Sequence, residues 1–465
     1  MKEIAALILA AGKGTRMKSG VCKVLHPVAG RPMISYVIDA VLSCGLQKIV
    51  IVVGHESVEV CKIAGVPGIE FALQEPQLGT GHAVASARDL FKGFSGDVLI
   101  LCGDIPLVQS RTIEEFVRFH RENSSKLTVM TTFPEIVAGY GRIMRTDQGQ
   151  VAGIVEDRDA DEAEKAVREI NTGVYLANAE LLYSLVDKIG ADNSQGEYYL
   201  TDIVKEATKQ AIPVHAFVLA NAKEATGINT RADLARVSAM VWNRLREDMM
   251  SSGVTLLDPS SVYIDSQVRV GVDTVIHPCV TISGRTEIGQ NCVIESGVYI
   301  MDSILGDGVR ILQGSRLDRA LVETGTAVGP MANLRPDAKI GKNARIGNFV
   351  EVKKTTLGNG SKAAHLTYLG DSLIGADVNI GCGTITCNYD GKKKHPTTIG
   401  DRCFIGSDVQ FIAPVEIGEG SIVGAGSTIT RDVPARSLAV SRAKQKIFPL
   451  RRGQGPGASD EDRKS

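Results

Sequence analysis

Glycine and basic residues directly after the first apolar run suggest phosphate binding. Gly12 and Gly14 occupy the first two glycine positions of a dinucleotide-binding fingerprint, but Met17 stands where the third would be, so that motif is absent. The G-K-[ST] ending of a P-loop is absent as well. What remains is a glycine-rich turn whose backbone N–H groups can bind phosphate, with positive charge from Arg16 and Lys23. This pattern predicts a phosphate site at the end of a strand.

A carboxylate follows another apolar run in the same half of the chain. Asp104 comes soon after residues 98–101, and an aspartate at the carboxyl end of a buried strand is a natural Mg²⁺ ligand. The alternative is that Asp104 caps a helix or forms a turn. Further polar islands lie at residues 74–82, 140–143, 156, 171–173 and 227–229.

An imidazole interrupts a pattern of small and aliphatic residues in the second half of the chain. His365 lies there, and a histidine can take a proton from an amine near neutral pH. Other polar residues that such a pattern does not require gather around it in the sequence: Arg335, Lys353, Tyr368, Asn379, Asn388, Tyr389, Ser407 and Arg442.

The elements that must position the first group of residues alternate between strands and helices. Aliphatic runs predict strands at residues 4–9, 49–53, 69–73 and 98–101, and helical spacing predicts helices at 33–42 and 82–90. Such alternation, which continues to about residue 228, favours a Rossmann-like α/β domain with a mostly parallel sheet. Ligands of these sheets bind at the carboxyl ends of the strands, where the polar islands fall.

A single amphipathic helix is predicted for residues 229–250. Asn229 or Thr230 can cap it, and Ser251, Ser252 and Gly253 end it. Its apolar residues recur at spacings of three and four: Leu234, Val237, Val241, Leu245 and Met249. The helix therefore reads as a linker between two different architectures.

The second architecture has a period of six residues. Aliphatic side chains recur at this period in three registers, beginning at Ile264, Val322 and Ile399, and many are followed directly by glycine. Neither a helix nor an ordinary strand has this period, whereas a coiled strand with a corner every six residues does. We therefore predict a left-handed parallel β-helix over residues 251–452, with about 18 residues in each coil.

Three breaks in the six-residue register are expected to be loops that leave a corner of the β-helix. They fall between Ile300 and Val322, between Val352 and Ile374, and at residues 386–398. The tail at 453–465 is polar and glycine-rich, so it is expected to be disordered.

Composition restricts the class of protein. Lys and Arg number 52 against 53 Asp and Glu, and the resulting net charge of −1 favours no nucleic-acid partner. Glycine stands at 49 of 465 residues and aromatic residues at only 5%, as expected for many tight turns. Nine cysteines without a C-x-x-C pair argue against a disulfide framework and a zinc site and favour a cytoplasmic protein. No apolar run approaches the ~18 residues that would span a membrane.

Taken together, these motifs resemble one known family. The strand followed by G-x-G-T-R-M, with a lysine seven residues after the arginine, is similar to sugar-1-phosphate nucleotidylyltransferases. From about residue 3 to residue 452, the chain resembles the bacterial bifunctional N-acetylglucosamine-1-phosphate uridyltransferase/glucosamine-1-phosphate acetyltransferase family. The resemblance implies two reactions with acetyl-CoA and UTP as co-substrates, Mg²⁺ as cofactor, and a homotrimer with acetyltransferase sites between subunits.

The resemblance also implies residue roles in the first half. Arg16 and Lys23 would hold the phosphates and act in catalysis, and Asp104 and Asn229 would bind Mg²⁺. The remaining positions would contact the nucleotide (Leu9, Ala10, Ala11 and Gly12), uracil (Gln74, Gly79 and Thr80) and the N-acetylglucosamine moiety (Gly141, Glu156 and Asn171).

For the second half, the resemblance implies that His365 is the general base of acetyl transfer. The glucosamine-1-phosphate would be held by Arg335, Lys353, Tyr368 and Asn379, and the acetyl-CoA and catalytic pocket would include Cys382, Asn388, Tyr389, Ser407, Ala425 and Arg442. Where many relatives have alanine, this chain has Cys382. The basic run 392–394 either meets anionic groups of the cofactor or belongs to a solvated loop.

Two alternatives remain open from the sequence. In the first, only the nucleotidylyltransferase is active and the β-helix regulates or oligomerises it, as in ADP-glucose pyrophosphorylases. His365, the Asn388-Tyr389 insertion and Arg442 weigh against it. In the second, the protein is a structural β-helix with a degenerate nucleotide-binding domain, which the presence of Lys23 and Asp104 disfavours.

Overall fold

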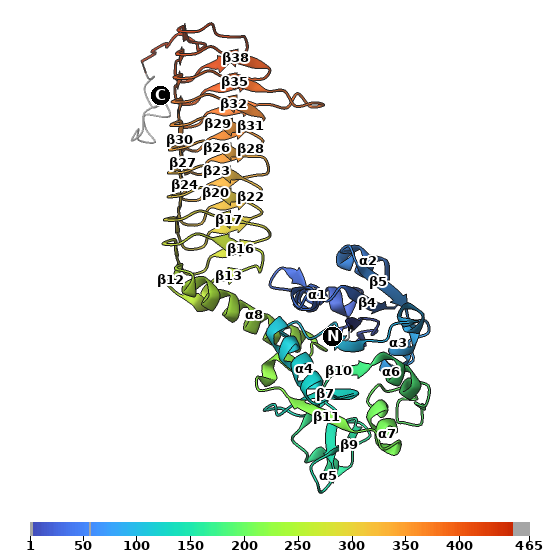
Figure 1. Ribbon diagram of the computed structural model, residues 1–465. Coiled ribbons are helices and arrows are strands. Elements are labelled where there is room, and N and C mark those ends of the chain that lie inside the picture. Colours follow the sequence, from blue (N-terminus) through green and yellow to red (C-terminus); the bar gives the residue numbers. More distant parts are fainter. Residues whose placement is uncertain (1–2, 55–56, 450–465) are drawn as a thin grey trace, which may run out of the picture. The chain divides into compact units, whose positions relative to one another are not determined.

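The computed structural model describes residues 3–54 and 57–449, and the predicted tail at 453–465 lies outside these residues. The chain forms two compact units, Met1–Leu245 and Arg246–Ser465 (Figure 1). Among the described residues, no helix combines the length and the apolar composition needed to cross a membrane.

The first unit is built on a nine-stranded mixed sheet, whose main strand order is β11-β7-β10-β6-β1-β4-β5. The four predicted strands are present and pair in parallel: β1 (Ile4–Leu9), β4 (Lys48–Val53), β5 (Ile69–Leu73) and β6 (Asp97–Cys102). The other strands of the main order are β7 (Leu127–Thr132), β10 (Ile170–Asn178) and β11 (Val214–Val218). Strand β10 runs antiparallel to both β6 and β7, while β8 (Arg142–Arg145) and β9 (Val151–Val155) form a hairpin beside it.

Helices cover both faces of this sheet, because alternate residues of each central strand point to opposite faces. In β1, Ile8 belongs to one buried cluster and Leu7 to another. The first cluster includes residues of α1 (Met33–Ser43), α2 (Ser57–Ala64) and α4 (Ser110–Glu122). The second includes residues of α3 (Thr80–Ser86), α6 (Ala179–Val186) and α7 (Asp202–Lys209). The short helix α5 (Glu162–Lys165) has no buried residue. The helix predicted at 82–90 is thus shorter than expected, because a 3₁₀ turn at Arg88–Phe91 replaces its last turn.

The predicted linker helix is α8 (Arg231–Ser251). Thr230 caps it: the Asp233 carboxylate accepts from the Thr230 backbone N–H at 2.8 Å, and the Thr230 hydroxyl oxygen accepts from the Asp233 N–H at 3.1 Å. The apolar residues of α8 contribute to two cores. Val237 and Val241 are fully buried in the first unit, and Met249 packs against the core of the second.

The second unit is the predicted left-handed β-helix. Its strands, β12 (Thr255–Leu256) to β41 (Leu438–Ala439), form three parallel sheets of eleven, ten and nine strands. Ile264 pairs with Ile282 and Ile282 with Ile300, so these coils contain 18 residues. The residues at the six-residue period lie in one continuous core that runs along the prism, where all but the half-buried Val270 are buried.

Two of the three expected loops are not loops. Between Ile300 and Val322, and again between Val352 and Ile374, the chain continues in regular strands, but Ile300 pairs with Leu317, a spacing of 17 residues. The reason is that the corner after each of these strands turns with one residue fewer. Asp302 and Arg319 have φ values of 46° and 49° at this corner, and Lys354 and Asp371 have 47° and 51°.

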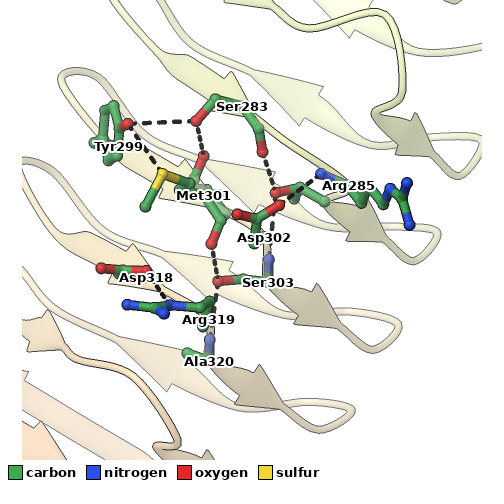
Figure 2. A network of polar contacts seen from close by, with 11 residues as sticks. Ser283, Arg285, Tyr299, Met301, Asp302, Ser303, Asp318, Arg319 and Ala320 are labelled. Carbon is green, nitrogen blue, oxygen red and sulfur yellow. Dashed lines mark hydrogen bonds and ion pairs between the residues drawn. The ribbon is translucent and has the colours of Figure 1, made fainter. Parts of the chain in front are cut away.

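Side chains bridge successive coils at this shortened corner (Figure 2). The Ser303 hydroxyl donates to the carbonyl of Met301 at 2.7 Å and accepts from the N–H of Ala320 in the next coil at 3.0 Å. Asp302 accepts from the N–H of Arg285 in the preceding coil at 2.9 Å. The corner therefore satisfies its backbone donors without additional residues.

The third break is a loop, as predicted. It connects β34 (Ile385–Cys387) to β35 (Thr397–Ile399) and leaves the side of the prism as a narrow hairpin (Figure 1).

Candidate active sites

The glycine-rich turn after β1 brings two cationic side chains toward the end of the sheet. Gly14 has a φ of 58°, and a Cβ at this position would lie only 2.7 Å from Cβ of Lys23. Glycine is thus required both for the left-handed conformation and for the close approach of Lys23. The 3₁₀ turn η1 (Thr15–Met17) follows and carries Arg16.

Lys23, Asp104, Asn229 and Arg16 form one polar cluster. The Lys23 ammonium contacts the Asp104 carboxylate in a very short ion pair and donates to Oδ1 of Asn229 at 3.2 Å. Arg16 donates to the same Asn229 oxygen at 2.9 Å. The N–H of Ile228 donates to the carbonyl of Asp104 at 3.0 Å, which ties the segment before α8 to the end of β6. Four residues from distant parts of the sequence therefore meet at one edge of the sheet.

This cluster fits the chemistry of a Mg²⁺ site. Asp104 and Asn229 offer hard oxygen atoms, the ligand type that Mg²⁺ prefers, and both already face a cation, the Lys23 ammonium. The part of the chain that the structure describes contains no group of three or more His, Cys, Asp or Glu side chains that could hold a metal. A magnesium ion here would accordingly take few protein ligands and keep water or phosphate oxygens.

A pocket of about 330 Å³ opens beside the glycine-rich turn, and its lining includes Ala10, Ala11, Gly12, Gly54 and Gln77. The Gln77 amide donates a short hydrogen bond to the carbonyl of Ala11 and so connects the loop after β5 to the turn after β1. Leu9, at the end of β1, accepts from the N–H of Gly103 at 2.9 Å. Gln77 lies within the polar island at 74–82, but the sequence suggested no role for it, because a glutamine in a loop has no distinctive spacing.

The residues expected to read uracil are held in a tight turn. The buried Gln74 side chain donates to the carbonyl of Gly79 at 2.8 Å. Gly79 has a φ of 107°, and a Cβ there would lie 2.6 Å from the carbonyl oxygen of Tyr198. The Thr80 hydroxyl accepts from the N–H of Leu200 at 3.0 Å. Neighbouring backbone thus fixes all three expected residues.

The residues expected to hold the sugar also meet. The N–H of Asn171 donates to the carbonyl of Gly141 at 2.8 Å, and a Cβ on Gly141 would lie 3.6 Å from Oε2 of Glu156. Burial raises the pKa of Glu156, although the hydroxyl of Thr201 donates to its carboxylate at 3.1 Å. A side chain at position 141 would also meet Cγ2 of Ile154 at 3.1 Å, so glycine there avoids a crowded contact beside the Glu156 carboxylate.

The Cys102 thiol links this sugar cluster to the Lys23 cluster. Burial raises its pKa to about 12, and the charges of Asp104, Lys23 and Glu156 all act on it. Cys102 ends β6 two residues before Asp104, and its thiol lies 3.7 Å from the carbonyl oxygen of Gly173, two residues after Asn171, so both clusters adjoin the end of β6.

In the β-helix, four of the expected acetyltransferase residues and one further residue form a column along one corner. Each lies two residues after a buried residue of the first sheet, and these buried residues pair from coil to coil. The members of this corner column are Asn348, His365, Cys382, Ser407 and Ala425. Backbone bonds join its neighbours, since Asp408 N–H donates to the carbonyl of Cys382 at 2.7 Å and Gly426 N–H to that of Ser407 at 2.8 Å.

Asn348 orients the imidazole of His365. Oδ1 of Asn348 lies 2.9 Å from Nδ1 of His365, and an amide oxygen can only accept, so Nδ1 carries the hydrogen. The neutral ring then has an unprotonated Nε2, the atom that a general base needs. Sequence reasoning missed Asn348, because its relation to His365 depends on the 17-residue pairing between their coils.

A basic cluster lies on the second sheet. Arg335 pairs with Glu351 at 2.8 Å, and the pKa of Lys353 is lowered chiefly by contact with the Lys394 ammonium. Tyr368 occupies the strand position next to Glu351 in the following coil. Three cations held this close can bind a dianionic phosphate.

Asn388 and Asp371 border the same cluster. The Asn388 amide donates to Asp371 at 2.6 Å and lies 3.5 Å from the Tyr368 hydroxyl. Tyr389 is exposed on the hairpin, and Arg442 donates to the carbonyl of Ala425 at 2.7 Å. Asn379 lies elsewhere, on the first sheet beside Lys362 of the previous coil.

Comparison with known proteins agrees with this two-part arrangement. Residues 5–243 match the model of the nucleotidyl transferase family. Residues 396–431 match the bacterial transferase hexapeptide model, and residues 268–301 match the hexapeptide repeat of succinyl-transferase.

Full-length relatives match both halves at once. The bifunctional protein GlmU of Pelobacter propionicus is 52% identical over 446 residues, covering 96% of this chain and 97% of that protein. The bifunctional protein GlmU of Geotalea uraniireducens is 51% identical, covering 96% and 98%, and that of Geobacter metallireducens is 49% identical, covering 96% and 97%. With this identity over nearly the whole length, the chain belongs to the family of bifunctional GlmU proteins.

Proposed function

We propose that this bifunctional enzyme divides its two activities between the halves of the chain. The enzyme makes UDP-N-acetylglucosamine by acetylating glucosamine-1-phosphate with acetyl-CoA and then transferring a uridylyl group from UTP to the N-acetylglucosamine-1-phosphate. In the proposal, residues 1–228 catalyse uridylyl transfer, residues 229–250 link the domains, and residues 251–452 catalyse acetyl transfer. The observation that supports it is that each half has its own cluster of reactive side chains.

Uridylyl transfer needs charge compensation more than a base. The anionic phosphate oxygen of the sugar attacks the α-phosphorus of UTP, the bond to the β-phosphate breaks, and pyrophosphate leaves with the electron pair. Arg16 and Lys23, at the open end of the sheet, would hold the phosphates and offset the charge that builds up. Mg²⁺, when bound by Asp104 and Asn229, would add positive charge at the same place.

The substrates of uridylyl transfer would bind on either side of this cluster. Leu9, Ala10, Ala11 and Gly12 would contact the nucleotide, and Gln74, Gly79 and Thr80 would read uracil. Gly141, Glu156 and Asn171 would hold the N-acetylglucosamine moiety. The rigid turns around Gly79 and Gly141 support this assignment, because preorganised polar groups lose little freedom on binding.

Acetyl transfer needs a base, because the amine of glucosamine-1-phosphate is mostly protonated at neutral pH. Nε2 of His365 would take the ammonium proton, the amine would attack the thioester carbonyl, and CoA would leave as the thiol after regaining a proton. Arg335, Lys353 and Tyr368 would hold the sugar phosphate.

Acetyl-CoA would bind along the corner column. Cys382, Ser407 and Ala425 are small residues of this column, and Arg442 contacts Ala425. Asn388 and Tyr389, at the start of the hairpin, would also contact the cofactor. Asn379, which would also hold the sugar, lies on a different sheet from the basic cluster. We therefore propose a homotrimer in which Asn379 of one subunit completes the site of another. The proposal places the enzyme in the cytoplasm, which supplies both UTP and acetyl-CoA.

Two crossed substitutions test the division of activities. Asp104→Ala should abolish pyrophosphate release from UTP and N-acetylglucosamine-1-phosphate while CoA release from acetyl-CoA and glucosamine-1-phosphate continues. His365→Ala should do the reverse, with acetyl transfer lowered ~10²–10⁴-fold. If either folded variant loses both activities, the assignment of one activity to each half is wrong.

A further inference from the structure

The hairpin between β34 and β35 (Figure 1) reaches the acetyltransferase cluster from both of its ends. Asn388 begins it and contacts Asp371, while Lys394 near its end contacts Lys353. The N–H of His395 closes the hairpin by donating to the carbonyl of Asn388 at 2.8 Å. The placement of these two ends therefore depends on the shape of the hairpin.

One carboxylate organises the inside of this hairpin. Oδ1 of Asp390 accepts from the backbone N–H groups of Lys392 and Lys393 at 2.7 and 2.6 Å. Oδ2 of the same side chain lies 2.7 Å from Nε2 of His395. Hydrogen bonds from the backbone of Lys393, from His395 and from the backbone of Lys392 lower the pKa of Asp390 to about 2. The carboxylate is therefore ionised at neutral pH and only accepts, so Nε2 of His395 donates.

Within the described part of this chain, no apolar packing replaces these bonds. Residues 389–394 are exposed, and Tyr389 bonds only within the hairpin, to the carbonyl of Gly391 at 2.7 Å. In addition, Lys394 is held beside Lys353, which has the same charge. When no phosphate is bound, the bonds of the hairpin must offset the electrostatic repulsion between the two ammonium groups. Without a lock at Asp390, repulsion would move Lys394 away from the cluster.

We propose that Asp390 and His395 are positioning residues for acetyl transfer, which lock the hairpin so that Lys394 stands beside Lys353 to receive the sugar phosphate. This inference rests on the proposed function of the basic cluster. His365 lies outside the hairpin and bonds Asn348. Loss of the lock should therefore weaken sugar-phosphate binding much more than it slows the chemical step at saturation.

The test uses the full-length enzyme and measures CoA release at varied glucosamine-1-phosphate. Asp390→Ala should raise KM for glucosamine-1-phosphate roughly tenfold, as expected for the loss of hydrogen bonds to a charged group, and change kcat by about twofold or less. Asp390→Asn keeps one oxygen for the two backbone donors, so it should recover most of the affinity. His395→Ala should raise KM by a smaller factor, because it removes only one of the three bonds.

Asp258→Ala is the matched control. Its carboxylate is half-exposed and also accepts locally, from the N–H of Ser260 at 3.2 Å, but it lies in the first coil of the β-helix, between β12 and β13 (Tyr263–Ile264), far along the chain from the hairpin. This variant should keep the wild-type KM.

The outcomes separate the inference from the function on which it rests. A wild-type KM in Asp390→Ala, or an equal loss in Asp390→Asn and Asp390→Ala, overturns the positioning role while the wild-type activity stands. A wild-type enzyme that releases no CoA overturns the proposed function and this inference with it.

Discussion

Removing the Asn348 side chain, which orients His365, should slow acetyl transfer by a factor that the strength of one hydrogen bond determines. Asn348→Ala deletes the 2.9 Å hydrogen bond to Nδ1 and leaves the imidazole itself in place. A net hydrogen bond is worth about 0.5–1.5 kcal/mol, which corresponds to roughly 2- to 13-fold in rate. The upper limit is the ~10²–10⁴-fold loss expected when the base is absent.

The assay is CoA release at saturating glucosamine-1-phosphate and acetyl-CoA, so that the change is seen in kcat. Asn359→Ala is the matched control, because Asn359 also accepts through Oδ1, from the N–H of Lys342 at 2.8 Å, but lies outside the corner column. This control should keep the wild-type kcat.

A double-mutant cycle decides whether Asn348 acts through His365. If it does, Asn348→Ala should have no further effect in a His365→Ala background, because there is no ring left to orient. An unchanged kcat in the single Asn348→Ala variant would refute the orienting role. A loss of the same size with and without His365 would also refute it.

Three further results are expected for uridylyl transfer. Because burial raises the pKa of Glu156, this carboxylate is protonated at a higher pH than an exposed glutamate; KM for N-acetylglucosamine-1-phosphate should therefore rise as pH falls, and Glu156→Gln should remove that dependence. EDTA should stop pyrophosphate release but leave CoA release unchanged, since acetyl transfer has no phosphoryl charge to offset; equal inhibition of both would argue against a metal site at Asp104. Gly14→Ala should lower kcat/KM for UTP about tenfold, because the new Cβ meets Lys23 at 2.7 Å and the left-handed backbone costs ~1–2 kcal/mol; a wild-type value would show that Lys23 need not be held so closely.

Most of the fold could be predicted from the sequence, because its signals are periodic. Burial of every sixth residue in a prism leaves a regular aliphatic pattern, and buried parallel strands leave continuous apolar runs. The shortened corners could not be predicted, since the residues at them, such as Asp302 and Lys354, have no distinctive type, and positive φ also occurs at full-length corners such as that of Asp273. A corner that is one residue shorter and an inserted loop both interrupt the six-residue period in the sequence. Only the pairing of strands between coils distinguishes the two.

Some residues of the candidate sites could likewise be predicted from the sequence and others could not. Residues with distinctive spacing, such as Lys23 and His365, stand out in the sequence. Gln77, Asn348 and Asp390 do not, because their contacts arise only when loops or coils are brought side by side.

A coupled assay can show whether one chain carries two sites that act in sequence. The full-length enzyme is given glucosamine-1-phosphate, UTP and Mg²⁺, with or without acetyl-CoA, and the release of CoA and of pyrophosphate is followed together. Pyrophosphate should appear only when acetyl-CoA is present, and after a lag behind CoA. Pyrophosphate release at the same rate without acetyl-CoA, or pyrophosphate release with no CoA release at all, would contradict it.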